Sequence, residues 1–369
     1  MKQLSLQAPQ LRPARFEDYK AIARFGMANS LNSQSVRDWQ SMWLDNPVWS
    51  RLGKNWHIGW ILESTAGDIV GTILNVPSLY TFRGQSLVCG NGRAWATTPE
   101  YRGYALWLMD EYFNQPQADL FINTTVGPTA AQIIDTLATR IPLGDWATGS
   151  TWVIAYAGFV KQALRSRRMP FADLVAYPAS GVLWLKHAIF NKSLPRSQRA
   201  VEIETVDSFD ARFDVLWDEI VRQKPETLLA DRSSNALSWH FNIPRRSGRL
   251  WIFTASRNRQ VRAYCILICT SDGRQVHFVD YQSADSDIDM LPGLLRAALR
   301  RCAREGVQLL RNVGRGVPKM RAMDECATYR NTFSNWRFYY RAADPSLHSE
   351  LRVPQYWDPS VYNGDASFK

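Results

Sequence analysis

A turn between a strand and a helix carries the residues best suited to bind an anionic ligand. Residues 98–105 read TPEYRGYA and precede a helical pattern from 104 to 113. The first turn of a helix offers unpaired backbone N–H groups and the positive end of the dipole, and glycine lets a phosphate approach the backbone. We therefore expect phosphate to bind at Arg102, Gly103, Tyr104 and Ala105. The alternative is an ordinary turn with a surface arginine, because short glycine signatures are common.

Two carboxylates are candidate general bases for a substrate amine. Glu63 closes an apolar strand in the first half of the chain, and Asp280 closes one in the second half. A carboxylate at a strand end can orient or deprotonate an amine. Asp280 is equally suited to capping the loop that follows it, since aspartate favours turns. A water chain is a third route for the proton, so the sequence leaves the base open.

The cysteines and histidines show no metal-binding pattern. Of the five cysteines only Cys265 and Cys269 are close together, and the five histidines are scattered. Zinc sites need closely spaced pairs of such ligands. The sequence therefore predicts a metal-free protein with reduced cysteines, as is usual in the cytoplasm.

The elements around the turn predict an antiparallel meander followed by a parallel pair of strands. The meander strands are expected at 57–62, 69–74, 79–82 and 86–89, a further strand at 92–98, a helix at 104–113 and a strand at 120–123. A strand–helix–strand passage of this kind makes the last two strands parallel and opens a crevice at their ends.

The second half of the chain repeats this order of elements. Tryptophan and Asn-Pro residues at 39–47 have an echo at 239–244, and the hairpin strands that begin at Asp68 and Gln260 recur at a similar offset. Two copies of one plan are therefore expected, each the size of an ordinary domain. The predicted division is 1–158, a linker at 159–200, and 201–369.

The element order and residues 98–106 resemble the GCN5-related N-acetyltransferases, and the chain looks like a tandem, double-domain member of that group. The resemblance implies an α/β fold with mixed sheets and two acyl-CoA N-acyltransferase-like domains. It also implies that acetyl-CoA or another acyl-CoA is the co-substrate, with its diphosphate on the Arg102-Gly103 turn. In the family two more small residues follow, and they fall here on Ala105 and Trp107. Trp107 is a departure from the pattern.

The resemblance assigns further residues to the cleft. Backbone N–H groups near Trp95, Ala96 and Thr97 are expected to polarise the thioester carbonyl, and Asn123, with Thr125, to lie beside the pantetheine. Capping of the next helix is the alternative role for Thr125.

The implied reaction is acyl transfer to an amine without a metal. A strongly basic region at 296–341 favours an anionic small-molecule or glycan acceptor, such as an amino-sugar or an intermediate of the cell envelope or of exopolysaccharide (polysaccharide biosynthesis). One alternative is a peptidoglycan-type transferase that uses aminoacyl-tRNA, and another is a non-catalytic tandem-domain binding protein. No specific nucleic-acid interaction is expected, because no recognised motif accompanies the charge.

The linker contributes much of the net charge of +10. Its apolar stretch at 171–190 contains Pro178 and Gly181, which predicts two short helices. One interpretation is a connector with solvated charges; the other is peripheral contact of 161–199 with an anionic membrane. Neither a spanning segment nor a signal peptide is evident, so a cytoplasmic location is expected, with any membrane contact at the inner face. The tail at 357–367 is expected to form an ordered strap.

Overall fold

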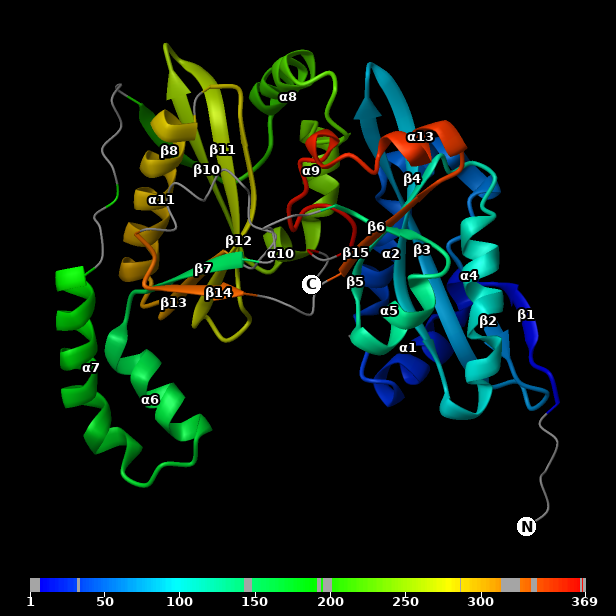
Figure 1. Ribbon diagram of the computed structural model, residues 1–369, viewed down its shortest axis with the longest axis horizontal. Coiled ribbons are helices and arrows are strands. Elements are labelled where there is room, and N and C mark those ends of the chain that lie inside the picture. Colours follow the sequence, from blue (N-terminus) through cyan, green and yellow to red (C-terminus); the bar gives the residue numbers. More distant parts are fainter. Residues whose placement is uncertain are drawn as a thin grey trace.

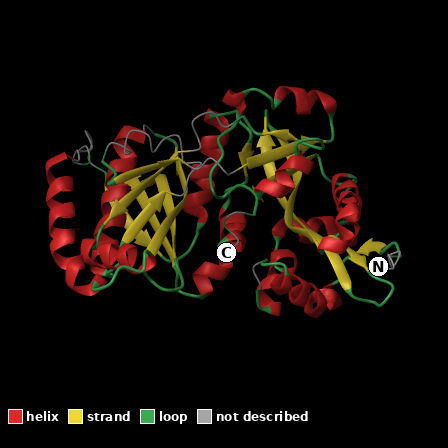
Figure 2. Ribbon diagram, turned by 60° about the horizontal axis from the view of Figure 1, so that its bottom comes forward, coloured by secondary structure: helices red, strands yellow, loops and turns green. Residues whose placement is uncertain are grey.

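The computed structural model describes residues 7–31, 34–142, 148–190, 194, 201–285, 287–312, 326–332, 337–365 and 367. Two mixed sheets lie side by side with helices around them (Figures 1 and 2). The first sheet has the strand order β1-β2-β3-β4-β5-β15-β6, with β9 beside β3, and the second has the order β14-β7-β13-β12-β11-β10-β8.

The strands of the first sheet are β1 (Gln10–Pro13), β2 (Gly59–Glu63), β3 (Ile69–Phe82), β4 (Gln85–Thr97), β5 (Leu120–Val126), β6 (Thr139–Arg140), β9 (Leu229–Ala230) and β15 (Arg337–Ala342). Those of the second are β7 (Thr148–Val153), β8 (Glu202–Val206), β10 (Leu250–Arg257), β11 (Gln260–Cys269), β12 (Gln275–Ser283), β13 (Leu309–Asn312) and β14 (Tyr329–Thr332). All neighbouring pairs are antiparallel except β4 with β5 and β12 with β13. The predicted order, an antiparallel meander followed by a parallel pair, is therefore confirmed in the first sheet. The number of strands is corrected, because the strands predicted at 69–74 and 79–82 form the single strand β3, and those predicted at 86–89 and 92–98 form the single strand β4.

Helices pack on both faces of each sheet. On the first sheet they are α1 (Tyr19–Ala28), α2 (Val36–Leu44), α3 (Pro47–Leu52), the 3₁₀ helix η3 (Pro99–Tyr104), α4 (Ala105–Phe113) and α5 (Pro128–Ile134). The remaining helices are α6 (Tyr156–Ser166), α7 (Ala172–Phe190), α8 (Ala211–Gln223), α9 (Ser234–His240), α10 (Asn242–Arg246), α11 (Asp287–Arg304) and α13 (Pro345–Glu350). The predicted α/β class with mixed sheets is confirmed.

Side-chain caps fix where several helices begin. The Ser35 hydroxyl accepts the backbone N–H of Asp38 at the start of α2, and the Asn46 side chain accepts that of Val48 at the start of α3. These bonds satisfy N–H groups that have no partner inside the helix. Trp43 near the end of α2 is fully buried and donates its indole N–H to the Asn75 carbonyl at 2.8 Å. This contact attaches α2 to the face of β3.

Three strands lie in the sheet that is formed mainly by the other half of the chain. β9 comes from the second half and pairs with β3 in the first sheet. β7 comes from the first half of the chain, but it lies between β13 and β14 in the second sheet. β15 comes from the second half, but it lies between β5 and β6 in the first sheet. The predicted segments 1–158 and 201–369 therefore do not coincide with the two sheets, because each sheet contains a strand from the other half.

One hydrophobic core is shared by both halves. The inner face of the first sheet contributes Tyr80, Leu120 and Tyr340, all at most 1% exposed, and these side chains belong to the same cluster as Phe213 and Ile266. A core of this extent stabilises both sheets in the same arrangement. The two halves of the chain therefore form one packed unit and not two separate domains.

The long apolar helix α7 corrects the prediction of two short helices. It runs from Ala172 to Phe190 with Pro178 inside it. Proline removes one backbone bond, but α7 packs along α6, and this tertiary packing maintains the helix through that position. Among the described residues, no helix combines the length and apolarity that crossing a bilayer requires.

Candidate functional site

The parallel strands β4 and β5 separate and leave a cleft between them. They pair only from Cys89–Asn91 to Leu120–Ile122, although both strands continue further. A cavity of about 130 Å³ opens beyond the last pair. Its lining includes Gly92, Arg93, Ala94 and Trp95 from β4, Asn123, Thr125 and Val126 from β5, and Ala130 and Ile134 from α5. The predicted crevice at the parallel strand ends is therefore present.

A bulge in β4 shapes one wall of the cleft. Thr72 pairs with Ala96 and Leu74 with Arg93, so β4 has one residue more than β3 between these pairs. Ala94 adopts a positive φ of 53° within the bulge, and the Thr72 hydroxyl donates to its carbonyl at 2.7 Å. A bulge releases backbone groups from the ladder and redirects them. Of the predicted backbone donors, Trp95 lies in the bulge, whereas Ala96 and Thr97 follow it and pair with Thr72 and Gly71 of β3.

Asn123 supplies a polar group to the opposite wall. It is 6% exposed, and its side-chain nitrogen makes no hydrogen bond of ordinary geometry among the described residues, although it lies beside Tyr112 and weakly lowers the pKa of that phenol. A buried donor without a partner is costly, so such a group in a cavity favours a ligand that accepts a hydrogen bond. Gly92 lies opposite, where a β-carbon would come within 2.1 Å of the Asn123 oxygen. The absence of a side chain at Gly92 therefore leaves room for the Asn123 amide.

The Arg102-Gly103 turn forms a 3₁₀ helix before α4. Tyr101 N–H bonds to the Thr98 carbonyl, and Ala105 N–H bonds to the Arg102 carbonyl. These bonds join residues three apart, as in any 3₁₀ helix. The expectation of unengaged amides at the opening of α4 is therefore wrong for Ala105. Arg102 and Gly103 are exposed, and a β-carbon on Gly103 would meet nothing within 4 Å.

Aromatic side chains connect this turn to the cleft. The Trp95 indole N–H donates to the Ala105 carbonyl at 3.3 Å, which attaches the end of β4 to the start of α4. Trp107, where the resemblance predicts a small residue, is 43% exposed and lies edge-on against Tyr104, with ring centroids 4.8 Å apart. Trp95, Tyr104 and Ala105 are thus brought together, and Trp95 lines the same cavity as Asn123 of β5.

The C-terminal strap reaches the cleft from the second half. The Asp365 carboxylate accepts from the hydroxyls of Thr124 and Thr125 on β5 at 2.9–3.0 Å, and lies 3.9 Å from the Arg93 guanidinium on β4. Burial lowers the pKa of Arg93, and the Asp365 charge offsets part of that effect. Asp365 therefore joins both diverging strands. The predicted ordered strap is confirmed, but its contact with this cleft was not predicted.

Neither predicted base lies in the lining of the cleft. Glu63 ends β2 and forms an ion pair with Arg12 at 2.6 Å, with Asp18 on the other side of the same guanidinium. The Arg12 side chain keeps the pKa of Asp18 below its usual range. These contacts place Glu63 in an ion-pair network towards the β1 edge of the sheet, and its predicted role in catalysis has no support from its position.

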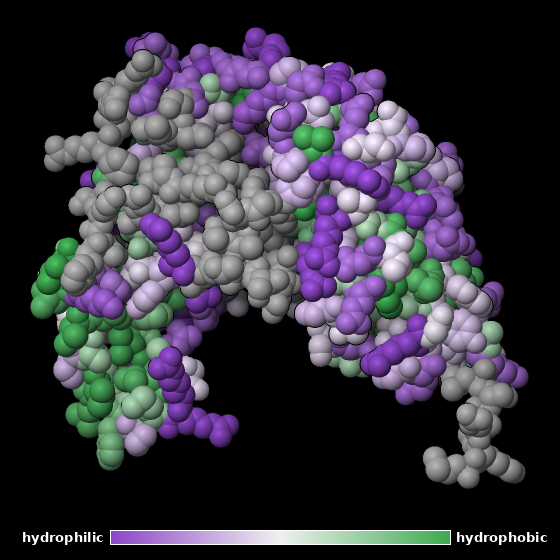
Figure 3. Space-filling view, viewed as in Figure 1, coloured by the Kyte–Doolittle hydropathy of each residue, from purple (hydrophilic) through white to green (hydrophobic). Residues whose placement is uncertain are grey.

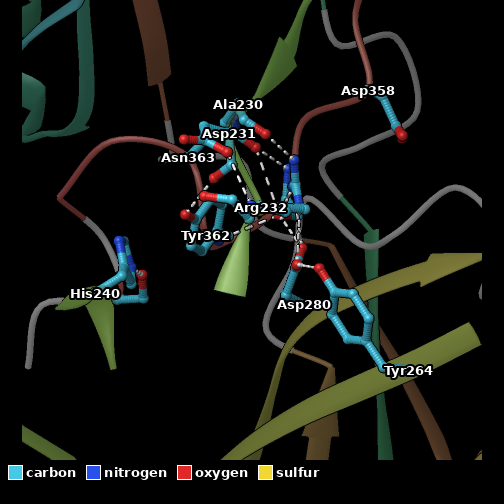
Figure 4. Close-up of polar contacts among 12 residues, drawn as sticks. Ala230, Asp231, Arg232, His240, Tyr264, Asp280, Asp358, Tyr362 and Asn363 are labelled. Carbon is cyan, nitrogen blue, oxygen red and sulfur yellow. Dashed lines mark hydrogen bonds and ion pairs between the residues drawn. The ribbon is translucent and has the colours of Figure 1, made fainter. Parts of the chain in front are cut away.

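Asp280 is part of a buried network between the two sheets (Figure 4). It is 0% exposed and accepts two hydrogen bonds from Arg232, at 2.8 and 3.1 Å, as well as one from Tyr264 and one from Ser360. Burial has the largest single effect on the Arg232 pKa and would lower it, but the charge of Asp280, the nearby Tyr264 and Tyr362, and the hydrogen bond to Asp280 together raise that pKa. The carboxylate is thus already occupied by side chains, which contradicts both predicted roles, the base and the loop cap.

In the second half of the chain, the described part of β12 carries Asp280 into the interior of the protein. The side of β12 that carries Asp280 faces the shared core, and Arg232 and Ser360 fill the space next to it. Within the described ranges, no group of three or more histidine, cysteine or acidic side chains is placed to hold a metal ion. The chemistry is therefore best sought in the first copy.

His240 lies close to the strap and makes the stability of the protein dependent on pH. Its ring is buried and hydrogen-bonded to Ser367, and burial, with the nearby charge of Arg232, lowers its pKa to about 3. The unfolded chain binds a proton at this histidine below about pH 6.5, whereas the folded chain does not. The contribution of His240 to the free energy of unfolding is therefore complete above pH 6.5 and decreases as the pH falls towards 3.

We expect wild-type protein to lose about 2 kcal/mol more unfolding free energy than a His240→Gln variant between pH 8 and pH 5. Urea unfolding at several pH values measures this difference. His57→Gln, at an exposed histidine, is the matched control and should follow the wild-type curve. Parallel pH profiles for wild type and His240→Gln would contradict a buried neutral ring.

Comparisons with known proteins identify the fold. No protein-family model and no curated protein sequence matches the chain. Among solved structures it is similar to a conserved Enterococcus faecalis protein of unknown function described as a probable N-acyltransferase, with a TM-score of 0.56 and 12% identity over 91% of this chain and 73% of that one. It is also similar to a GCN5-related N-acetyltransferase from Anabaena variabilis, with a TM-score of 0.53 and 12% identity over 91% and 73%.

A third similar structure is Saccharomyces cerevisiae N-myristoyltransferase with bound myristoyl-CoA, with a TM-score of 0.52 and 10% identity over 93% of this chain and 80% of that one. The protein therefore has the GCN5-related N-acetyltransferase fold, in an arrangement that extends over most of each of these longer chains. The fold class implied by the resemblance is confirmed.

Proposed function

We propose that the protein is an acyl-CoA-dependent N-acyltransferase whose donor binds between β4 and β5. The observation that carries the proposal is the cleft itself, with the bulge at Ala94 on one wall and the unsatisfied Asn123 amide on the other. The solved structures of the same fold are acyltransferases by their descriptions, and one holds myristoyl-CoA. These descriptions support an acyl-CoA donor here.

The chain's residues fit the parts of such a donor. The exposed Arg102 and the open surface at Gly103 suit the diphosphate, since an arginine forms charge-assisted bonds with phosphate oxygens. The Asn123 amide suits a carbonyl of the pantetheine arm. Backbone N–H groups at the bulged end of β4 suit the thioester oxygen, where negative charge develops.

The proposed reaction is direct attack of an amine on the thioester. A C–N bond forms, the C–S bond breaks, and the electron pair leaves with sulfur as CoA thiolate. The attacking nitrogen loses one proton to water, because neither Glu63 nor Asp280 lines the cleft. Positioning of the two reactants and stabilisation of the oxyanion then provide most of the rate enhancement.

The acceptor is proposed to be an anionic amine, such as an amino-sugar or another glycan intermediate. Support comes from charge, since the chain carries 44 basic and 34 acidic residues. Arg337 and Arg341 on β15 belong to the first sheet. Basic side chains on this strand favour a negatively charged partner near the strand that adjoins β5.

Arg102→Ala should weaken binding of CoA by about 10- to 100-fold, because it removes a charge-assisted bond to phosphate. Isothermal titration with CoA, acetyl-CoA and myristoyl-CoA measures the loss. Arg51→Ala removes an exposed arginine on α3 and is the matched control. Unchanged CoA affinity in the Arg102 variant would exclude the turn as the diphosphate site.

A second variant tests the cleft separately from the turn. Asn123→Ala removes the buried donor and should weaken acyl-CoA binding by about five- to tenfold. Acetyl-CoA hydrolysis or transfer to added amines then reports activity.

A protein that binds no CoA species but is stabilised against heat by aminoacyl-tRNA would favour the peptidoglycan-type transferase. One observation favours this second candidate function. The Ala105 N–H is bonded to the Arg102 carbonyl and is therefore not free to bind the diphosphate of CoA.

A further inference from the structure

The helical hairpin formed by α6 and α7 exposes a continuous apolar face. It projects from the second sheet at the lower left of Figure 1, and the same region is the largest green area of Figure 3. Its exposed apolar side chains are Met169, Phe171, Leu174, Val175, Tyr177, Val182, Trp184, Leu185 and Ile189, each between 43% and 75% exposed. A face of this size on a helix that is not covered by protein marks an interaction surface.

The two faces of α7 are clearly separated. Ala172, Ala176, Ser180 and His187 are buried against the rest of the hairpin, at a spacing of about one helical turn or a multiple of it. The opposite face contains no charged residue. The only charged side chains of α7 are Asp173 and Lys186. On a helical wheel both lie at the borders between the buried and exposed faces.

Side-chain contacts join α7 to α6 and to β14 of the second sheet. The His187 ring is hydrogen-bonded to the Tyr156 hydroxyl at 3.0 Å and lies edge-on against Tyr329 of the second sheet. Asp173 accepts from Lys161 and Arg165 of α6, each at 3.0 Å, which joins the two helices near their tip. These contacts turn the apolar face of α7 away from α6 and the second sheet.

The charge of the hairpin indicates what covers this face. Residues 156–190 contain five basic side chains and one acidic side chain, and the acidic one, Asp173, is already paired. Arg167 and Arg168, at the turn beside the exposed Met169 and Phe171, have no ion-pair partner within the described part of the chain. Cations next to exposed apolar and aromatic side chains match the interface of a bilayer that contains anionic lipid.

We infer that the α6–α7 hairpin docks on an anionic membrane, with the outer face of α7 in the interfacial region. The helix lies along the surface, since no described helix is long and apolar enough to cross. A water-exposed helix needs a polar outer face, which α7 lacks. This inference is independent of the proposed acyl transfer, because none of the residues that line the cleft belongs to the hairpin.

Flotation of the full-length protein with lipid vesicles tests the inference. Vesicles of phosphatidylcholine with phosphatidylglycerol should retain the protein, whereas vesicles of phosphatidylcholine alone should retain far less. Arg167→Gln with Arg168→Gln should weaken binding to the anionic vesicles by about 25-fold, because each basic residue near such a surface contributes about fivefold. Arg222→Gln with Arg300→Gln, at exposed arginines of α8 and α11, is the matched control and should bind like wild type.

A second pair of substitutions tests the apolar contribution. Leu174→Gln with Leu185→Gln should weaken vesicle binding by at least about tenfold, since both side chains would leave the lipid. Glutamine supports a helix nearly as well as leucine, and both positions are exposed, so folding should be unchanged. Met27→Gln with Val215→Gln makes the same change at exposed positions of α1 and α8 and should have no effect on binding.

Several results would overturn the inference. One is equal binding of wild type to neutral and anionic vesicles, and another is binding that survives both hairpin variants. A third is absence of vesicle binding together with a dimer in light scattering that Leu174→Gln with Leu185→Gln converts to a monomer. That result would assign the apolar face to a second copy of the chain.

Discussion

Asp280→Ala should lower the free energy of unfolding by about 3–5 kcal/mol, because it leaves Arg232 buried without its counter-charge. The Arg232 side chain is 1% exposed and that of Asp280 is 0% exposed. A water that fills the resulting cavity can accept hydrogen bonds but carries no charge to balance Arg232. Urea denaturation followed by circular dichroism measures the change.

The surrounding contacts explain why the effect should be large. Tyr264 and Ser360 also donate to Asp280, and the Arg232 guanidinium lies 4.7 Å from the centre of the Tyr362 ring. Burial, followed by the charge of Asp280, raises the pKa of Tyr264 well above its usual value, so the phenol remains a donor. Removal of the carboxylate thus leaves several buried polar groups unsatisfied at once.

Two control variants distinguish the cost of leaving a buried charge unpaired from the cost of losing an ion pair in general. Asp280→Leu combined with Arg232→Met replaces both partners with apolar groups, and should recover most of the stability lost in Asp280→Ala. Glu204→Ala removes a partner of Arg212 in an ion pair whose side chains are 43% and 53% exposed, and should cost less than about 1 kcal/mol. A loss for Asp280→Ala as small as that for Glu204→Ala would contradict the structural role of the network.

The local elements of the cleft could be predicted from the sequence because their signals are local. Alternating apolar residues predict the meander, and Pro99 followed by a helical pattern predicts the passage into α4. The parallel pair follows from the order of elements. The 3₁₀ form of the turn was not predicted. The choice between hydrogen bonds to residue i−3 and to residue i−4 depends on small differences in free energy, which residue types do not reveal.

The role of Asp280 was mispredicted because its partners are distant in sequence. Arg232 lies 48 residues before it and Ser360 lies 80 residues after it. A carboxylate at a strand end looks the same in sequence whether it faces solvent, a substrate or a buried arginine. For the same reason the sequence does not reveal the role of Asp365, which contacts Thr124 at a separation of 241 residues.

The strand exchange was also beyond the reach of sequence patterns. β7 and β15 are short strands that alternate like many others, and nothing in their residues specifies which sheet they enter. Their pairing is set by the complete core, and above all by the cluster that both halves share. The repeat in the sequence predicts two similar units, and it therefore suggests a separation that the structure does not have.

Fragments 1–158 and 201–369 should each fail to unfold cooperatively when produced alone. The first lacks β15, whose Phe338, Tyr339 and Tyr340 are at most 1% exposed. Loss of one large buried aromatic side chain costs about 3–5 kcal/mol, so losing three removes about 10 kcal/mol. That amount is comparable with the whole stability of a typical domain, about 5–15 kcal/mol.

The second fragment loses a strand from inside its sheet. β7 lies between β13 and β14 and carries the buried Trp152, so 201–369 alone leaves the β13 edge unpaired and β14 without its partner. Unpaired edges of this kind promote aggregation.

Calorimetry and amide-proton NMR of each fragment measure the outcome. A mixture of the two fragments refolded from denaturant should regain one cooperative transition, because 1–158 carries β7 and 201–369 carries β9 and β15, the strands that the other sheet lacks. A dispersed spectrum and a sharp melting transition for either fragment alone would show that its sheet does not need the exchanged strand. We expect instead that neither fragment folds cooperatively alone, because the strand exchange extends the core of each sheet across both halves of the chain.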